Sequence, residues 1–225
     1  MSRCILSCTS LLEFVQAAQQ SEKTDYPVFT VDRAMHVEPE RMREAVIRTI
    51  DALPTEFDTV LVAMGFCGGV WHETSFSRTV VIPRVDDCIS LLMHTDDDFH
   101  PNLKVDGHLY LYENDPRDFS ALTLMHNTNS FTQDLDLKNL SKEFLFEMWF
   151  HNYRNMDIID TGLNDCYSEG YVAAAQEQAD QIVAKESSAE VDPEQARRDE
   201  ALFKSLEKKK KKKRRKIIRT VILVS

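Results

Sequence analysis

Two short and nearly unbroken apolar runs stand out along the chain. Residues 60–64 read Val-Leu-Val-Ala-Met, and residues 79–82 read Thr-Val-Val-Ile. Runs of this length without polar alternation are typical of strands buried on both faces, as in a parallel sheet. Each run ends in a loop that carries a cysteine, Cys67 or Cys88. Because ligands of open α/β sheets bind beyond the carboxyl ends of the strands, we expect both thiols at the functional edge.

The pattern before these runs alternates between strand and helical spacing. It predicts strands over 4–7 and 26–31, and helices over 10–20 and 38–53. The second helix opens with proline between two acids, which suits a first helical turn. Strand and helix therefore alternate up to residue 64, which predicts a parallel sheet with right-handed crossovers. The expected fold class is α/β, with a mostly parallel open sheet flanked by helices.

The later part of the chain predicts fewer and less regular elements. They are a short helix over 89–93, a strand over 107–112, a helix over 142–153 capped by Ser141, a strand over 157–162 and a helix over 171–185. We predict one α/β domain over residues 1–185. Residues 186–225 are polar, then poly-lysine, then apolar for nine residues. Because blocks of like charge are usually disordered, this segment is expected to be a charged C-terminal tail.

The uneven distribution of charge along the chain bears on whether nucleic acid is a partner. The net charge is −10, but ten of the 27 Lys and Arg lie between Lys208 and Arg219, which leaves 17 basic against 37 acidic residues over 1–207. An acidic body argues against a specific nucleic-acid partner, which needs a basic surface. No apolar stretch approaches the 18 or so residues of a transmembrane helix, so no transmembrane span is expected.

Cysteine usage points to a reducing compartment. The chain has five cysteines, an odd number spread widely over the sequence, which does not resemble a secreted disulfide framework. We therefore expect reduced thiols and a cytoplasmic location.

Four residues with soft-metal donor atoms recur at the predicted strand ends. They follow the first, second, third and fourth strands in turn, and they are Cys8, His36, Cys67 and Cys88. In a parallel sheet all four lie on one edge. Three thiolates and an imidazole suit zinc or an iron centre, whereas Mg²⁺ and Ca²⁺ prefer oxygen ligands. The alternative is structural, since cysteines often pack as small hydrophobes and loop histidines often only hydrogen-bond.

Neighbouring residues could complete a site there. Gly65, Gly68 and Gly69 flank Cys67 and allow the backbone to approach a metal or another cofactor without a Cβ clash. Arg84 is a candidate for receiving an anionic substrate or a cofactor carboxylate. Asp87 is a candidate for orienting His36 or Arg84, so we count Arg84 and Asp87 as candidate catalytic residues.

Several of these segments together resemble a bacterial and archaeal domain family of unknown function. The segments are Ser7-Cys8, His36–Arg43, Met64–Gly69 and Val81–Cys88, with Gly107–Leu111 and Ile158–Gly162. The Gly-x-Cys-Gly and Pro-Arg-x-x-Asp-Cys motifs are the most specific of them. The resemblance implies that Cys8, His36, Cys67 and Cys88 act together, and it implies a loose link to corrinoid methyl-transfer systems. Members continue with a strand and a helix where this chain turns to lysines.

Three functions remain open, and whether the chain is an enzyme is one of the open questions. The first is a metal- or cofactor-binding protein, an enzyme or an accessory protein in corrinoid-linked methyl transfer, in which zinc activates a substrate thiol. Its partners would be a small-molecule substrate or a corrinoid methyl-transfer protein, with a possible corrinoid contact. The second is a metal-free thiol enzyme with Cys67 as nucleophile and His36 as base. The third is a non-catalytic partner-binding protein.

Overall fold

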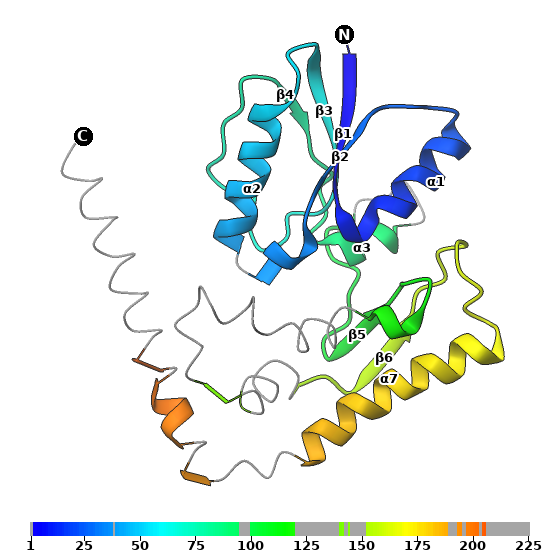
Figure 1. Ribbon diagram of the computed structural model, residues 1–225, viewed down its shortest axis with the longest axis vertical. Coiled ribbons are helices and arrows are strands. Elements are labelled where there is room, and N and C mark those ends of the chain that lie inside the picture. Colours follow the sequence, from blue (N-terminus) through cyan, green and yellow to red (C-terminus); the bar gives the residue numbers. More distant parts are fainter. Residues whose placement is uncertain are drawn as a thin grey trace. The chain divides into compact units, whose positions relative to one another are not determined.

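Four parallel strands form the central sheet, in the order β2-β1-β3-β4 (Figure 1). They are β1 (Ser2–Cys8), β2 (Val28–Val31), β3 (Phe57–Ala63) and β4 (Thr79–Val81). The central strand, β1, is aligned so that Cys8 faces Val31 of β2 and Ser7 faces Ala63 of β3. The predicted fold class, a mostly parallel α/β sheet with flanking helices, is confirmed.

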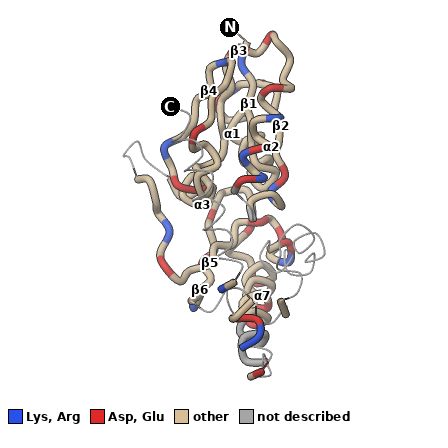
Figure 2. The backbone as a smooth tube through the Cα atoms, turned by 90° about the vertical axis from the view of Figure 1, so that its left-hand side faces the viewer, with Lys and Arg blue, Asp and Glu red and all other residues tan. Residues whose placement is uncertain are grey.

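The first two crossovers place helices on opposite faces of this sheet. Helix α1 (Leu12–Glu22) follows the 3-10 turn η1 (Thr9–Leu11), and α2 (Pro39–Ala52) follows η2 (Arg33–Val37). The chain passes from β1 out to β2, then back over β1 to β3. Right-handed connections in these two directions put the helices on opposite sides of the sheet, as Figure 1 shows. Figure 2 also shows acidic and basic positions interspersed along α2.

The core of this sheet region is built from the inward positions of β1, α2 and β3. Leu6, Val46 and Val60 are fully buried in one hydrophobic cluster. Met42, Val46 and Ile50 follow one another at intervals of four residues along α2, and all three are fully buried. This packing fixes where each strand ends, and so positions the loops that carry the candidate site.

Strand β4 departs from the expectation that its apolar run is buried on both faces. It is the last strand of the sheet and has only three residues, and Val81 is 50% exposed. A strand at an edge has one neighbour fewer, so apolar residues in sequence do not guarantee burial on both faces. The expectation of burial on both faces is wrong for this strand.

Beyond the parallel sheet, the elements described before residue 169 are short, and a longer helix, α7, follows them. They are α3 (Cys88–Leu92), β5 (His108–Leu111), η3 (Pro116–Asp118), β6 (Asn155–Ile158) and α7 (Glu169–Ser188). Strands β5 and β6 pair with each other in a separate two-stranded sheet. His108 Nδ1 lies 2.7 Å from Asp157 Oδ2 across that pair.

The computed structural model describes residues 2–37, 39–94, 100–119, 140–141, 144, 152–188, 193–194, 197–202 and 204–205. Most of the helix expected over 142–153 and the poly-lysine segment lie outside these residues. Contacts divide the chain into one unit of residues 1–112 with 157–164 and another of residues 113–156 with 165–225. The single domain over 1–185 and the tail over 186–225 stay predictions.

The second unit has its own buried contacts. Tyr171 of α7 is buried and its hydroxyl donates to the carbonyl of Glu113 at 2.8 Å. Asp199 is also buried and accepts a hydrogen bond from the Ser141 hydroxyl at 2.6 Å. Among the helices in the described ranges, none is both long and apolar enough to cross a membrane.

Candidate functional site

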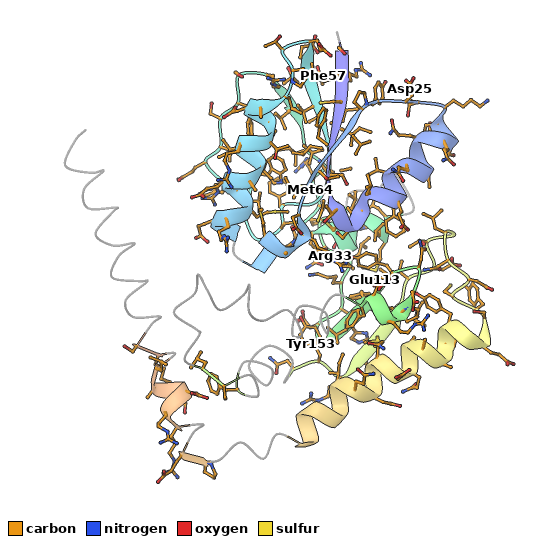
Figure 3. The ribbon with its side chains drawn as sticks, in the orientation of Figure 1. Asp25, Arg33, Phe57, Met64, Glu113 and Tyr153 are labelled. Carbon is orange, nitrogen blue, oxygen red and sulfur yellow. The ribbon has the colours of Figure 1, made fainter. Side chains whose placement is uncertain are left out.

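The four predicted donor residues all lie beyond the carboxyl ends of the parallel strands. Cys8 ends β1, His36 lies in η2 after β2, Cys67 lies in the loop after β3, and Cys88 begins α3 after β4. From β1 the chain adds β2 on one side of the sheet and then β3 and β4 on the other side. The boundary between β1 and β3 is therefore the switch point of the topology, where ligands of doubly wound sheets bind. Figure 3 labels both ends of β3, with Phe57 at its start and Met64 just past its end.

Cys67 and Cys88 form a buried pair of thiols. Their sulfur atoms lie 3.8 Å apart, and the residues are 2% and 7% exposed. The pKa of the Cys88 thiol is raised well above its ordinary value, first by its hydrogen bond with Cys67 and then by burial. The backbone N–H of Gly65 and the charge of His36 act in the opposite direction. Without a cation, Cys88 is therefore a protonated thiol.

Cys8 and His36 form a second pair. The Cys8 sulfur is buried, with 1% of the residue exposed, and accepts a hydrogen bond from the Ser10 hydroxyl at 3.2 Å. The pKa of His36 is raised, chiefly by a side-chain hydrogen bond with Cys8 and further by the charges of Cys88 and Asp87, against the effect of burial. Both thiols therefore act on the pKa of the His36 imidazole, Cys8 more strongly than Cys88.

The two pairs do not amount to a finished metal centre. In the part of the chain that the structure describes, no three His, Cys, Asp or Glu side chains form a group that could hold a metal ion as they stand. The structure therefore brings Cys67 and Cys88 into contact, and the pKa of His36 responds most strongly to Cys8. A single site would require the side chains of the two pairs to turn toward a common point.

Gly65 is the point where the two cysteine loops cross. A Cβ atom at Gly65 would lie 2.4 Å from the Cα of Asp87, closer than any side chain tolerates. On either side of this contact the loops are joined by backbone hydrogen bonds, from Phe66 to Val85 at 2.9 Å and from Cys67 to Asp86 at 2.7 Å. The glycine therefore admits the backbone of the chain itself. A role for it in binding a cofactor stays a prediction.

The next residues of this loop turn through left-handed backbone. Cys67, Gly68 and Gly69 have φ values of 47°, 72° and 91°. Glycine adopts this region freely, but a cysteine there is strained by about 1–3 kcal/mol. Such strain persists only where the surroundings impose it, and it directs the Cys67 side chain inward, as its burial records.

Two side chains that the hydrophobic pattern does not single out hold the loop in place. The buried indole of Trp71 donates to the Gly65 carbonyl at 3.0 Å. Arg43 of α2 donates to the carbonyls of Gly69 at 2.9 Å and Val70 at 3.3 Å. The only sequence signal for Arg43 is a basic residue beside the buried stripe of an amphipathic helix, and that signal is weak.

Asp87 and Arg84 take different places around Cys88. Asp87 caps α3 by accepting from the Ser90 N–H at 2.8 Å, and its other oxygen pairs with Lys104 at 2.5 Å. It therefore fixes the turn that carries Cys88. Arg84 is exposed in the loop between β4 and α3. Catalytic roles for either residue stay predictions.

The remaining cysteines lie elsewhere. Cys4 is fully buried in the core near the start of β1, where burial raises the pKa of its thiol. Cys166 is buried in the second unit. The described cysteines thus divide into three near the carboxyl edge of the sheet and two that are not part of this group.

Comparison with known proteins adds one finding. A family model described as "Protein of unknown function (DUF1638)" matches residues 30–199, which include His36, Cys67 and Cys88 but not Cys8. No curated protein and no solved structure matches the chain. The link to corrinoid methyl-transfer systems stays a prediction.

Proposed function

The chain belongs to the DUF1638 family of proteins of unknown function, and we propose that it binds a thiophilic metal ion through Cys8, His36, Cys67 and Cys88. The observation that carries the proposal is the contact between the Cys67 and Cys88 sulfurs at 3.8 Å, beside the switch point of the sheet. Each of the four residues comes from the end of a different parallel strand. Residues that only filled the core would have no reason to recur at all four ends.

The separation of the Cys67 and Cys88 sulfurs fits a shared metal. Two sulfurs that each lie about 2.3 Å from a tetrahedral zinc ion are about 3.8 Å apart. The observed separation is 3.8 Å. The donor set is equally suitable, because thiolate and imidazole ligands select zinc and other soft or borderline ions over Mg²⁺ and Ca²⁺.

In this proposal the Cys67–Cys88 pair forms the fixed half of the site. Cys8 and His36 would turn from their mutual hydrogen bond to complete it. When bound, such an ion supplies Lewis-acid chemistry, and the residues around it hold its ligands in place. Asp87 would do so by capping the helix that begins at Cys88, and Gly65 by allowing the two loops to cross.

The test is the metal content of the full-length chain. We expect the wild type purified from zinc-supplemented cells to hold about one ion per chain, as structural Cys/His sites do. Loss of a residue that only supports a ligand costs about 10–100-fold in affinity, so Cys67→Ser or Cys88→Ser should lower affinity by more than about 100-fold. Cys4→Ala is the matched control, since Cys4 lies on the same strand as Cys8 but outside the group.

Two results would contradict the proposal. One is a folded wild type that takes up no zinc, cobalt or iron under reducing conditions. The other is a Cys67→Ser variant that keeps the metal content of Cys4→Ala.

A thiol enzyme is the second candidate, because of the contact between Cys8 and His36. A thiol beside an imidazole is the arrangement of an activated nucleophile. The hydrogen bond joins His36 to Cys8, so Cys8 would be the nucleophile in place of Cys67. However, Cys8 is buried at the end of a strand that pairs on both sides, which restricts access of a substrate. Burial therefore favours the metal proposal.

A further inference from the structure

We propose that Cys67 and Cys88 are a site of reversible oxidation, at which a peroxide joins the two thiols in a disulfide bond. The contact between the two sulfurs and the pairing of the loops that carry them support this, and neither depends on a bound metal.

The two sulfur atoms already lie against each other. They are 3.8 Å apart, although the residues are 21 positions apart in the sequence. A disulfide needs a separation of about 2.05 Å, so the sulfurs must approach each other by roughly 1.8 Å. Rotation about the Cα–Cβ bonds of the two cysteines moves the sulfurs without moving the backbone.

The backbone segments that carry the two thiols are tied side by side. The N–H of Cys67 donates to the carbonyl of Asp86 at 2.7 Å, and the N–H of Phe66 donates to the carbonyl of Val85 at 2.9 Å. Cys88 follows two residues after Asp86 and begins α3. Because a disulfide forms only where the two backbones already lie close, this pairing supplies the approach that a crosslink requires.

Oxidation of the pair balances with one molecule of hydrogen peroxide. The O–O bond breaks as one thiol sulfur takes an oxygen, which gives a sulfenic acid and one water. The neighbouring sulfur then attacks the sulfenic sulfur, the S–S bond forms, and the oxygen leaves as a second water. The two thiols together lose two electrons and two protons, and the peroxide gains both. A dithiol reverses the step by thiol–disulfide exchange and becomes a disulfide itself.

Burial selects a small oxidant. Cys67 and Cys88 are 2% and 7% exposed, so a peroxide, which is nearly as small as water, reaches the sulfurs more readily than a bulky disulfide such as oxidised glutathione. The contact between the sulfurs also limits damage. Once one sulfur is a sulfenic acid, the other thiol lies next to it, so the disulfide forms ahead of further oxidation to sulfinic acid.

The test uses the full chain, freed of metal with a chelator and treated with hydrogen peroxide near neutral pH. The free cysteines should fall by two, from five to three, and the chain should lose the mass of two hydrogen atoms. After the remaining thiols are alkylated, trypsin places the two residues on separate peptides, 49–78 and 85–104. These peptides should appear as one linked species, at least about tenfold more abundant than any other linked pair, because the fold holds these two thiols together. Dithiothreitol should separate them again.

A chain unfolded in urea before the peroxide is added is the matched control. Its crosslinks should be spread over several pairs of cysteines, since no fold selects one pair. In the folded Cys88→Ser variant, Cys67 should stop at the sulfenic acid, which dimedone labels, because the resolving thiol is missing. Cys4→Ala removes a buried thiol of the core and should form the link between 67 and 88 as the wild type does.

Two results would overturn the inference. One is a folded chain that keeps all five thiols at peroxide concentrations that crosslink the unfolded chain, since the buried pair would then be inert. The other is a folded chain in which Cys67 or Cys88 is linked mainly to a different cysteine. Neither result bears on the metal proposal, which is tested under reducing conditions, where the pair is a dithiol.

Discussion

At the scale of single residues, the candidate site depends on a crossing that leaves no room for a side chain. The backbone of Asp87 passes so close to Gly65 that a methyl group there would overlap three of its atoms. Because these are backbone atoms, the strain could be relieved only by separating the two loops. Cys67 and Cys88 lie two residues from Gly65 and one residue from Asp87 respectively, so any such movement would change the distance between their sulfurs.

This crossing predicts a large effect for Gly65→Ala. Overpacking at a fixed contact costs about 1–3 kcal/mol and sometimes more, so the free energy of unfolding should fall by at least that amount. Metal uptake should fall with it. Urea unfolding measured by circular dichroism checks the first expectation, and metal analysis checks the second.

Gly170 provides the matched control. It lies in α7, and a methyl group at this position would have nothing within 4 Å of it. Replacing a helical glycine by alanine stabilises by about 0.5–1 kcal/mol, so Gly170→Ala should be neutral or slightly stabilising. Equal stability of the two variants would show that the crossing at Gly65 is not a constraint.

At the scale of elements, α2 reaches across to hold the loop that carries Cys67. Its residue Arg43 donates to two consecutive carbonyls, of Gly69 and Val70. The segment that includes Pro101 plays a similar part on the other loop, accepting the N–H of Asp86 at 2.7 Å. The loops of the site are therefore held from both sides by elements distant in sequence.

Arg43→Ala is expected to loosen the Cys67 loop. Hydrogen bonds from a charged group contribute about 1.5–3 kcal/mol, and Arg43 makes them from a half-buried position, so stability should fall by about 1–2 kcal/mol. Arg48→Ala, at an exposed position of the same helix, should change it by less than about 0.5 kcal/mol. Chemical denaturation of the metal-free chains measures both. If the two variants unfold alike, Arg43 is not a positioning residue.

The elements themselves could be predicted from the sequence, but their arrangement could not. The apolar run at 60–64 correctly indicated a strand, and strand–helix alternation correctly indicated parallel pairing. The order β2-β1-β3-β4 was not predictable, because each crossover can turn to either side without any change in local pattern. The approach of His36 to Cys8 depends on that order, since it places β2 next to β1.

The crossing at Gly65 was equally hidden from sequence reasoning. The glycines were predicted to admit a metal or another cofactor, which stays a prediction, whereas at Gly65 the structure places the backbone of Asp87. The partner is the 85–87 segment, which follows a strand whose position in the sheet was unknown. Arg43 and Trp71 were missed for the same reason, since both act on backbone carbonyls of a loop whose path the pattern does not encode.

At the scale of the whole molecule, the second unit carries contacts of its own that can be tested apart from the site. Tyr171 is buried, and its hydroxyl donates to the Glu113 carbonyl. Burial, with the charge of Glu113, raises the pKa of Tyr171 to about 12. An unperturbed tyrosine ionises near about pH 10, so the folded chain favours the neutral phenol.

The sign of this shift gives a pH dependence. A raised tyrosine pKa contributes stability that is complete below about pH 10 and is lost as the pH rises toward about 12. We expect the absorbance of tyrosinate at about 295 nm to include one late-titrating group in the wild type that is missing in Tyr171→Phe. A wild type and a variant with superimposable late titrations would contradict this. The variant should also lose less stability than the wild type over the same alkaline range.

The way the four donors are distributed also affects how such a site can be found. A zinc finger collects its ligands by short fixed intervals along one segment, so its motif can be read from spacing. Here each donor sits at the exit of a separate strand, and the sheet sets their proximity. The helices and loops that connect one strand to the next can therefore change in length without moving any of the four donor residues. Searches for sites of this kind should therefore compare strand exits across a sheet and disregard the intervals between cysteines.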